Sequence, residues 1–286
     1  MGTVLFLDSG LGGLPYCRRF LLRNPRSQAV YLADRAAFPY GSKTREELTR
    51  LLTGHFTRLI PLFNPALAAL VCNTASVSCL AELRKRFPSL PFVGTVPAVK
   101  PAVRASRLKS VGILGTERTI ADPYIDELAR RYGPDCAIRK IAAPELVEFV
   151  ERRCRTAGDE ERRRTAASYV EQFRGLGCDC IVLGCTHFLF LLEEFRAAAG
   201  AALTVYDSMD GVCGRIEGLL NAPDAKPQGG SRSGQAALSG GVSGLPLKTS
   251  LLLLTGEEEI GPSWKACAED FGLEPRLLED MGGKGR

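Results

Sequence analysis

Short apolar runs that alternate with amphipathic stretches constrain this chain more than any other feature of its sequence. The runs are apolar throughout rather than at every second position, which is typical of strands buried on both faces of a parallel sheet. The stretches between them have the spacing of helices that cover such a sheet, so we expect an α/β fold. The expected strands span residues 4–7, 30–32, 68–71, 111–114, 181–183, 203–205 and 251–254, and the clearest helices span 45–59, 77–86 and 160–173.

Charge and apolar content leave open what the chain binds. The formal net charge of +5 over 286 residues suits anionic small molecules as well as nucleic acid and selects neither. No apolar run is long enough to span a bilayer, and the N-terminus has no signal-like segment. We therefore expect a cytoplasmic protein without membrane association, whose ten cysteines are free thiols.

Small and polar residues follow several expected strands, at the points where helices should begin. In open α/β sheets, ligands bind at these carboxyl ends of the strands, where helix N-termini offer free N–H groups to carboxylates or phosphates. Two of the junctions are alike, because residues 70–74 and 183–187 each place a cysteine and then polar residues after an apolar run. This similarity suggests an internal duplication, with one such loop in each half.

Cys72 and Cys185 stand at these two junctions, and both suit proton transfer. A helix N-terminus should favour the thiolate and lower the thiol pKa from about 8.5 towards neutrality. Such a thiol can take a proton as thiolate and return one as thiol, and racemisation needs one such group on each face of the substrate carbon. The alternative is that both are buried core thiols. That is our interpretation of Cys17, Cys79, Cys136, Cys154, Cys213 and Cys267.

Residues 8–13 form a glycine-containing loop after the first expected strand. Its glycines permit a tight turn and close backbone approach to an anion, but it lacks the dinucleotide fingerprint and the lysine of a P-loop. Asp8 stands at the strand end, where it can orient a catalytic group. Residues 39–42 indicate a turn before a helix that begins near Thr44, with Ser42 as a candidate N-cap. His55 lies in that helix and is interpreted as structural.

Two other patterns are weighed and set aside. The residues Cys178, Cys180, Cys185 and His187 are close enough in sequence to suggest zinc, but a strand over 181–183 would separate them and no CxxC pair is present. We therefore predict no metal. The charged run 151–164 mixes both signs without interleaved aromatic residues, so we expect a solvated helix and no nucleic-acid partner.

A stretch rich in Gly, Ser, Ala and Pro, residues 227–246, is expected to be a flexible loop. An apolar run and a helical pattern over 262–270 follow it, so the C-terminal part should pack onto the body of the protein rather than form a separate domain.

Several motifs together resemble a known family. They are DSGLGG (8–13), FPYGSKT (38–44), VCNTAS (71–76), VGILGTERT (111–119), IVLGCTHF (181–188), YDS (206–208) and, near the end, LLTGEEE. In this order the set resembles the glutamate racemases of the aspartate/glutamate racemase superfamily over nearly the whole chain. Each motif is weak alone, but the ordered set is specific.

The resemblance implies two similar three-layer α/β domains with mainly parallel sheets, facing each other across an active-site cleft. Residues 1–95 and 209–286 would form the first domain and residues 96–208 the second. The implied reaction interconverts L- and D-glutamate without pyridoxal phosphate, metal or other cofactor, and supplies D-glutamate for peptidoglycan. A homodimer is implied as well.

The resemblance also assigns roles to individual positions. Cys72 and Cys185 match the two acid/base thiols, the first acting on the D-enantiomer and the second on the L-enantiomer. Asp8 and His187 match the residues that assist them. The positions that match substrate-binding residues are Asp8, Ser9, Tyr40, Gly41, Ser42, Asn73, Thr74, Thr186 and His187. Asp34, Glu151, Thr116 and Thr119 match supporting positions.

The chain departs from the family pattern at three places. Leu189 stands where proline is usual, Ala143 where cysteine is frequent, and residues 227–246 resemble an insertion. None of these removes a catalytic group. Their effect would fall on fine specificity and on the packing of the C-terminal segment.

Three other functions remain open. An aspartate racemase would keep both cysteines, although His187 favours glutamate, because aspartate racemases more often carry an acid there. A non-catalytic glutamate-binding protein would not require two thiols. A cysteine hydrolase using Cys185 and His187 is disfavoured, because residues two apart need not form a thiolate–imidazole pair and Cys72 would have no role.

Overall fold

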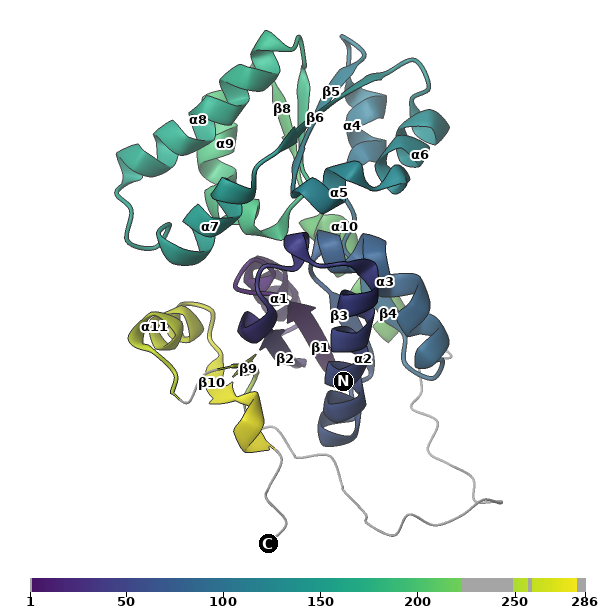
Figure 1. Ribbon diagram of the computed structural model, residues 1–286, viewed down its shortest axis with the longest axis vertical. Coiled ribbons are helices and arrows are strands. Elements are labelled where there is room, and N and C mark those ends of the chain that lie inside the picture. The colour runs from purple at the N-terminus through teal and green to yellow at the C-terminus, as the bar shows by residue number, and fades with distance from the viewer. Residues whose placement is uncertain (1, 223–248, 257–258, 282–286) are drawn as a thin grey trace, which may run out of the picture.

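The computed structural model describes residues 2–222, 249–256 and 259–281, and its strands form two sheets (Figure 1). The expected loop 227–246 lies outside the described residues. The larger sheet has the order β10-β9-β2-β1-β3-β4 and the smaller one β6-β5-β7-β8, with parallel pairing throughout the described strands. In the larger sheet the strands are β1 (Thr3–Asp8), β2 (Gln28–Ala33), β3 (Leu67–Leu70), β4 (Phe92–Gly94), β9 (Leu251–Leu254) and β10 (Glu274–Leu277). In the smaller sheet they are β5 (Ser110–Gly115), β6 (Ala137–Ala142), β7 (Cys180–Leu183) and β8 (Thr204–Tyr206).

All seven expected strands are present within a few residues of their expected bounds, and three further strands were not expected. The missed strands β4, β6 and β10 all lie at sheet edges. Of these, β6 and β10 are largely not buried, so they need not be apolar throughout. β6 carries Arg139 and Lys140, and β10 contains Pro275 and Arg276, so neither strand forms an apolar run in the sequence.

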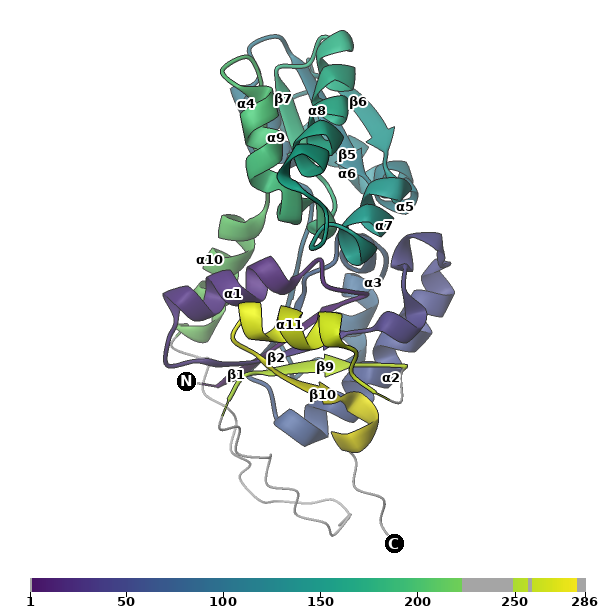
Figure 2. The same cartoon turned by 90° about the vertical axis from the view of Figure 1, so that its left-hand side faces the viewer.

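Helices cover both faces of the larger sheet. Neighbouring residues of a strand point to opposite faces, so each strand contributes side chains to two cores. Val4 and Phe6 of β1 pack in one core with α1 (Leu14–Arg23), α10 (Met209–Leu220) and α11 (Pro262–Asp270), and Figure 2 shows α1 and α11 on that side. Leu5 and Leu7 face a second core with α2 (Arg45–Phe63) and α3 (Asn73–Arg86). Because α11 and the strands on either side of it join this unit, the C-terminal segment packs onto the body as expected.

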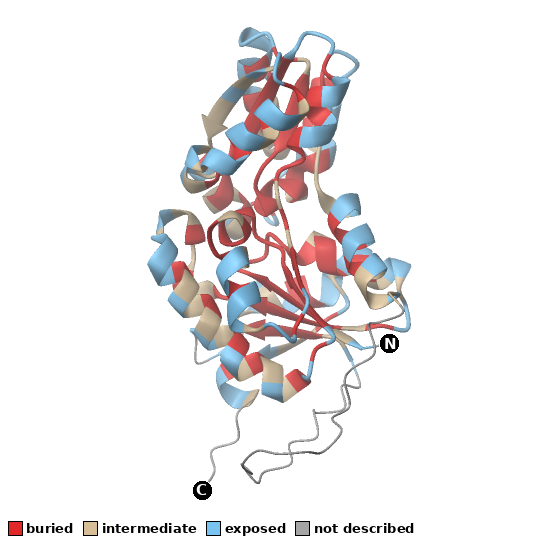
Figure 3. Cartoon of the chain, turned by 90° about the vertical axis from the view of Figure 1, so that its right-hand side faces the viewer, coloured by how far each residue is buried: buried red, intermediate tan, exposed pale blue. Residues whose placement is uncertain are grey.

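The smaller sheet is covered in the same way. Ile181 and Leu183 of β7 pack with α7 (Pro144–Arg152), α8 (Asp159–Gly175) and α9 (Leu192–Ala199). Val182 faces the other side, towards α4 (Val99–Ala105) and α6 (Pro123–Tyr132). Figure 3 shows the buried strands between partly exposed helices in both units. The core that holds α1 and α10 continues into α7–α9, so the two units share one apolar cluster.

The remaining elements of the described structure are one short helix and four 3-10 turns. They are α5 (Glu117–Ala121) and the 3-10 turns η1 (Arg35–Ala37), η2 (Tyr40–Ser42), η3 (Thr186–Leu191) and η4 (Leu278–Met281). Thr44, rather than the expected Ser42, caps α2. Its hydroxyl accepts a hydrogen bond from Glu47 N at 3.2 Å, while the Glu47 carboxylate accepts one from Thr44 N at 2.7 Å. Ser42 instead donates to the carbonyl of Pro39 at 3.1 Å.

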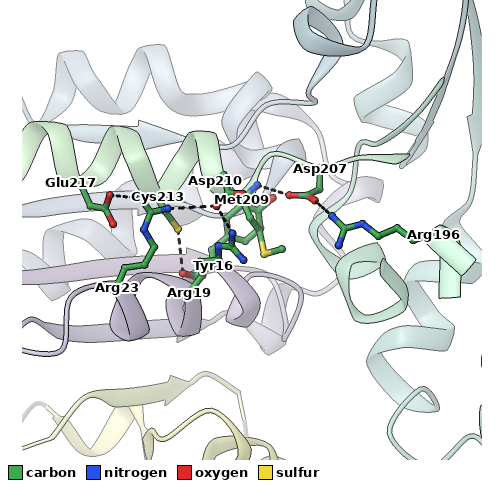
Figure 4. A network of polar contacts seen from close by, with 9 residues as sticks. All are labelled: Tyr16, Arg19, Arg23, Arg196, Asp207, Met209, Asp210, Cys213 and Glu217. Atoms are coloured by element: carbon green, nitrogen blue, oxygen red, sulfur yellow. Dashed lines mark hydrogen bonds and ion pairs between the residues drawn. The ribbon is translucent and has the colours of Figure 1, made fainter. Parts of the chain in front are cut away.

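The chain returns from the smaller to the larger unit between β8 and α10, where polar contacts fix its path (Figure 4). Arg196 of α9 lies 3.3 Å from the Asp207 carboxylate, which also accepts a hydrogen bond from Met209 N at 2.9 Å. Arg19 of α1 pairs with Asp210 of α10 at 2.5 Å. These contacts tie the crossing point to helices of both units. Within the described residues, we find no helix with the length and apolar character needed to cross a membrane.

Candidate active site

Residues within four positions of the carboxyl ends of β1, β3, β5 and β7 line one cavity of about 230 Å³. Both sheets contribute to it, as expected for strands that end at the same site. Of the predicted substrate-binding residues, all but Asp8 line this cavity, together with both candidate cysteines and Thr116. The lining residues are Ser9, Pro39, Tyr40, Gly41, Ser42, Cys72, Asn73, Thr74, Thr116, Glu117, Pro144, Glu145, Val147, Glu148, Cys185, Thr186 and His187.

Cys72 lies between β3 and α3, at the N-cap position of the helix. Its thiol is hydrogen-bonded to the Asp8 side chain and to the backbone of Ala75. The expected lowering of its pKa is wrong for this thiol. Burial and the neighbouring Asp8 carboxylate raise the pKa of Cys72 well above its ordinary value, and the backbone contact at the helix start offsets only part of this.

Asp8 lies at the end of β1 and is fully buried behind the cavity wall. Its carboxylate accepts hydrogen bonds from Ser9 N at 2.7 Å and from the Thr186 hydroxyl at 2.9 Å. Burial raises the pKa of Asp8, although His187 and these hydrogen bonds act in the opposite direction. Asp8 is therefore placed to act through Cys72 and Thr186 rather than by lining the cavity.

Cys185 lies at the start of η3, and its partner is a histidine rather than an acid. The Cys185 sulfur is 3.9 Å from Nδ1 of His187, whose Nε2 is 2.8 Å from the Glu151 carboxylate of α7. Burial alone would lower the pKa of His187, but the contacts with Cys185 and Glu151 raise it well above its ordinary value. The imidazole is therefore held in its protonated form, beside the thiol of Cys185.

Asp34 lies behind Tyr40 and does not line the cavity. Its carboxylate accepts hydrogen bonds from the Tyr40 hydroxyl at 2.7 Å and the Thr255 hydroxyl at 2.8 Å, and lies 2.9 Å from Nε2 of His55. Burial alone would raise the pKa of Asp34, but hydrogen bonds from His55, Tyr40 and Thr255 hold it below its ordinary value. Asp34 thus fixes a cavity-lining tyrosine, and His55 serves this network, in line with a structural role.

Three threonines connect the two units at the cavity edge. The Thr74 hydroxyl lies 3.0 Å from that of Thr116 and 3.3 Å from that of Thr119, and the Thr116 hydroxyl donates to Thr119 at 2.9 Å. Thr74 and Thr116 line the cavity, whereas Thr119 is fully buried behind them.

Asn73 shows that the cavity suits a polar ligand. The residue is 2% exposed and lines the cavity. Within the described part of the chain, neither its amide nitrogen nor its amide oxygen has a hydrogen-bond partner. A buried amide without partners costs free energy, so both atoms are available to a bound molecule.

Sequence reasoning missed the carboxylates that line the cavity from α5 and α7. These are Glu117, Glu145 and Glu148, and the Tyr169 hydroxyl donates a hydrogen bond to Glu145. A helical signal was available for α7, because Glu145, Glu148 and Glu151 are spaced three apart and therefore share a face. No lysine or arginine is among the described residues that line the cavity.

Cys178 and Cys180 do not join this site. Cys180 begins β7 and Cys185 follows its other end, so the strand separates them as expected. In the described ranges, no group of three or more His, Cys, Asp or Glu side chains is arranged to hold a metal ion.

Comparison with known proteins places the chain in a family. The profile of the Asp/Glu/Hydantoin racemase family matches residues 24–213. A glutamate racemase of Sphingopyxis alaskensis is 39% identical over 220 residues, which are 76% of this chain and 82% of that protein. One from Treponema pallidum (strain Nichols) is 38% identical over 210 residues, or 73% and 78% of the two chains.

A solved structure agrees with these sequence matches. The crystal structure of Escherichia coli glutamate racemase in complex with L-glutamate and the activator UDP-MurNAc-Ala has a TM-score of 0.77 and 29% identity, and the match covers 96% of this chain and 97% of that one. The similarity therefore extends over both sheets and the cavity between them. The chain belongs to the Asp/Glu/Hydantoin racemase family.

Proposed function

We propose that this protein is a glutamate racemase that moves a proton between Cys72 and Cys185 across the bound substrate. The observation that carries the proposal is that both thiols line one cavity, each with a different proton-transfer partner behind it. Asp8 stands behind Cys72, and His187 stands beside Cys185. Two thiols with separate partners are what racemisation by two opposed bases requires.

The proposed reaction starts at Cys185 for L-glutamate. The Cys185 thiolate takes the α-hydrogen as a proton, and the electron pair of the broken C–H bond passes into the α-carboxylate. The Cys72 thiol then gives its proton to the opposite face of the α-carbon, and D-glutamate leaves. Asp8 accepts the hydrogen bond of the Cys72 thiol, while protonated His187 stabilises the thiolate of Cys185. The reverse reaction exchanges the roles of the two thiols.

Binding of the substrate must be achieved without a lining lysine or arginine. The N-terminus of α3 offers backbone N–H groups beside Asn73 and Thr74, which suits a carboxylate. The amide of Asn73 and the hydroxyl of Ser9 add donors within the same cavity, and the Thr186 hydroxyl, which donates to Asp8, adds an acceptor. We assign these groups to the two carboxylates and the amino group of glutamate.

The wider expectations belong to this proposal as well. We propose domains of residues 1–95 with 209–286 and of residues 96–208, a division that the allocation of strands to two sheets supports. We further propose a cytoplasmic homodimer that needs no metal or cofactor and supplies D-glutamate for peptidoglycan. The relatives named glutamate racemase support the activity on which this role depends.

Aspartate racemase is the second candidate function, because it uses the same pair of thiols. A hydrolase gains one argument from the structure, since Cys185 and His187 do contact each other at 3.9 Å despite their separation by a single residue. Cys72 in the same cavity still has no role in hydrolysis. A binding protein would explain Asn73 but not the two thiols with their partners.

The test is incubation of metal-free protein with L-glutamate in D2O, followed by optical rotation and by deuterium at the α-carbon. Loss of rotation together with deuterium in the product supports the proposal. Activity with aspartate alone would move the assignment to that substrate. Glutamate binding without α-hydrogen exchange would overturn the racemase proposal in favour of a binding protein.

A further inference from the structure

The glycine loop after β1 meets the histidine–glutamate pair of the other unit. Leu11 N donates a hydrogen bond to Oε2 of Glu151 at 3.1 Å, and the same oxygen lies 2.8 Å from Nε2 of His187. Leu11 belongs to the loop that follows β1 in the larger sheet, whereas Glu151 and His187 belong to α7 and η3 beside the smaller sheet. One carboxylate oxygen is therefore shared between the loop of one unit and the imidazole of the other.

Two glycines make this approach possible. A Cβ on Gly10 would lie 2.4 Å from Oε2 of Glu151, and a Cβ on Gly12 would lie 2.4 Å from Nδ1 of His187. Neither glycine has a positive φ, so the requirement is for space rather than for unusual backbone geometry. The anion that this loop approaches closely is thus the carboxylate of Glu151.

We infer that residues 10–12 are a positioning element for His187. Their backbone holds Glu151 against the imidazole, so the proton-transfer partner of Cys185 is completed only by contact with the opposite unit. The contact is reciprocal, because Thr186 of the smaller unit donates at 2.9 Å to Asp8, the partner of Cys72. Each thiol therefore has a partner whose position depends on the other unit.

The first test does not depend on turnover. The chain has only two histidines, His55 and His187, so NMR of histidine labelled with ¹⁵N reads their titrations separately. The titratable groups that face His187 are Cys185, Glu151 and Asp8. We expect the pKa of His187 to fall in Gly10→Ala and Gly12→Ala, because the added methyl group displaces Glu151 or the imidazole. The titration of His55 should stay unchanged.

Three further variants make the test specific. Glu151→Gln adds no atoms to the loop contact and should lower the pKa of His187 even if the alanine variants fail to fold. Gly2→Ala introduces a similarly close contact, 2.5 Å from Cβ of Ala66 and away from this loop, so it should lower stability without moving the His187 titration. Gly54→Ala, inside α2, has nothing within 4 Å of the new Cβ and should leave the His187 titration as in the parent protein.

The kinetic test rests on the proposed function and uses α-deuterated L- and D-glutamate. We expect Gly10→Ala to lower kcat about 10²-fold, the size expected for a misplaced catalytic group. Because only the Cys185 step is slowed, the primary isotope effect should rise for the L-enantiomer and fall for the D-enantiomer. A purely structural defect would lower turnover while leaving both isotope effects unchanged.

The two kinds of failure can be told apart. An unchanged His187 titration in both Gly10→Ala and Glu151→Gln would overturn the positioning role, whatever the enzyme does. A shifted titration in a protein that racemises neither glutamate nor aspartate would leave the positioning role standing and remove the proposed reaction.

Discussion

The two halves of the candidate site place similar loops in unlike electrostatic settings. Cys72 faces the carboxyl group of Asp8, and burial together with that acid holds the thiol pKa high. Cys185 faces His187, which Glu151 and the thiol keep protonated. An acid beside a thiol favours its protonated form, whereas an imidazolium stabilises a thiolate. These unlike settings support the proposal that Cys72 gives a proton and Cys185 takes one, although the two strand–cysteine junctions look alike in sequence.

Removal of either thiol should have the largest effect on racemisation and tests whether the two halves act differently. We expect Cys72→Ala and Cys185→Ala each to lower racemisation by at least about 10²–10⁴-fold, because each removes one acid/base group. The variants should differ in hydrogen exchange measured by NMR in D2O. Slow α-exchange should persist with L-glutamate in Cys72→Ala and with D-glutamate in Cys185→Ala.

Cys136→Ala is the matched control, since this half-buried thiol does not line the cavity. It should keep the parent rate. Near-normal turnover of either active-site variant would contradict a mechanism with two bases.

Substitution of the residues that assist the two thiols should have the next largest effect on turnover. Asp8→Asn and His187→Gln each remove a charged partner but keep a similar shape, and we expect kcat to fall about 10²-fold in both. The isotope effect should rise for D-glutamate in the first variant and for L-glutamate in the second. Equal changes for both enantiomers would show that the partners do not serve separate thiols.

The two partners should also affect stability in different pH windows. His187 has a raised pKa in the folded state, so folding binds its proton more tightly and the free energy of unfolding should fall as pH rises above 6.5. The slope for one proton is at most about 1.4 kcal/mol per pH unit. Urea unfolding between pH 6 and 8.5 should show this slope in the parent protein and lose it in His187→Gln.

Asp8 has a raised pKa as well, but its ordinary value is 3.8. Because the pKa of Asp8 is higher in the folded than in the unfolded protein, the free energy of unfolding should also fall as pH rises above 3.8. Asp8→Asn should remove this pH dependence. A slope above pH 6.5 that survives in His187→Gln would contradict the assignment.

Tyr40→Phe should have the smallest effect and tests the support behind the Cys72 half. The substitution removes one of the hydrogen bonds that Asp34 accepts and should cost about 1–3 kcal/mol of unfolding free energy. KM should rise more than kcat falls, because Tyr40 lines the cavity without contacting a catalytic thiol partner. Tyr132→Phe, in a residue outside the cavity lining, serves as the control in both measurements.

Sequence and structure agree where the signal is local. The central strands are apolar on both faces, so β1, β2, β3, β5, β7 and β9 were found from their runs, and the cysteines that follow β3 and β7 were found from the strand ends. The partners of the site are less local. Leu11 and Glu151 are 140 residues apart, so the glycine loop predicted close approach to an anion but could not show that this anion is the carboxylate of Glu151.

The pKa of Cys72 shows the same limit. A helix start can be predicted from sequence, but the burial of the thiol and the approach of Asp8 depend on tertiary packing, and these outweigh the helix. The support of Tyr40 through Asp34 likewise depends on Thr255, which is 221 residues from Asp34 in sequence.

The return of the C-terminal segment to the larger sheet has a consequence during synthesis on the ribosome. β9 pairs with β2 and β10 with β9, so the side of β2 away from β1 has no neighbour until residue 254 has emerged. All four strands of the smaller sheet have been made by residue 206. We therefore expect the inserted unit to fold first on the nascent chain, while the outer edge of β2 stays open to mispairing and to capture by chaperones.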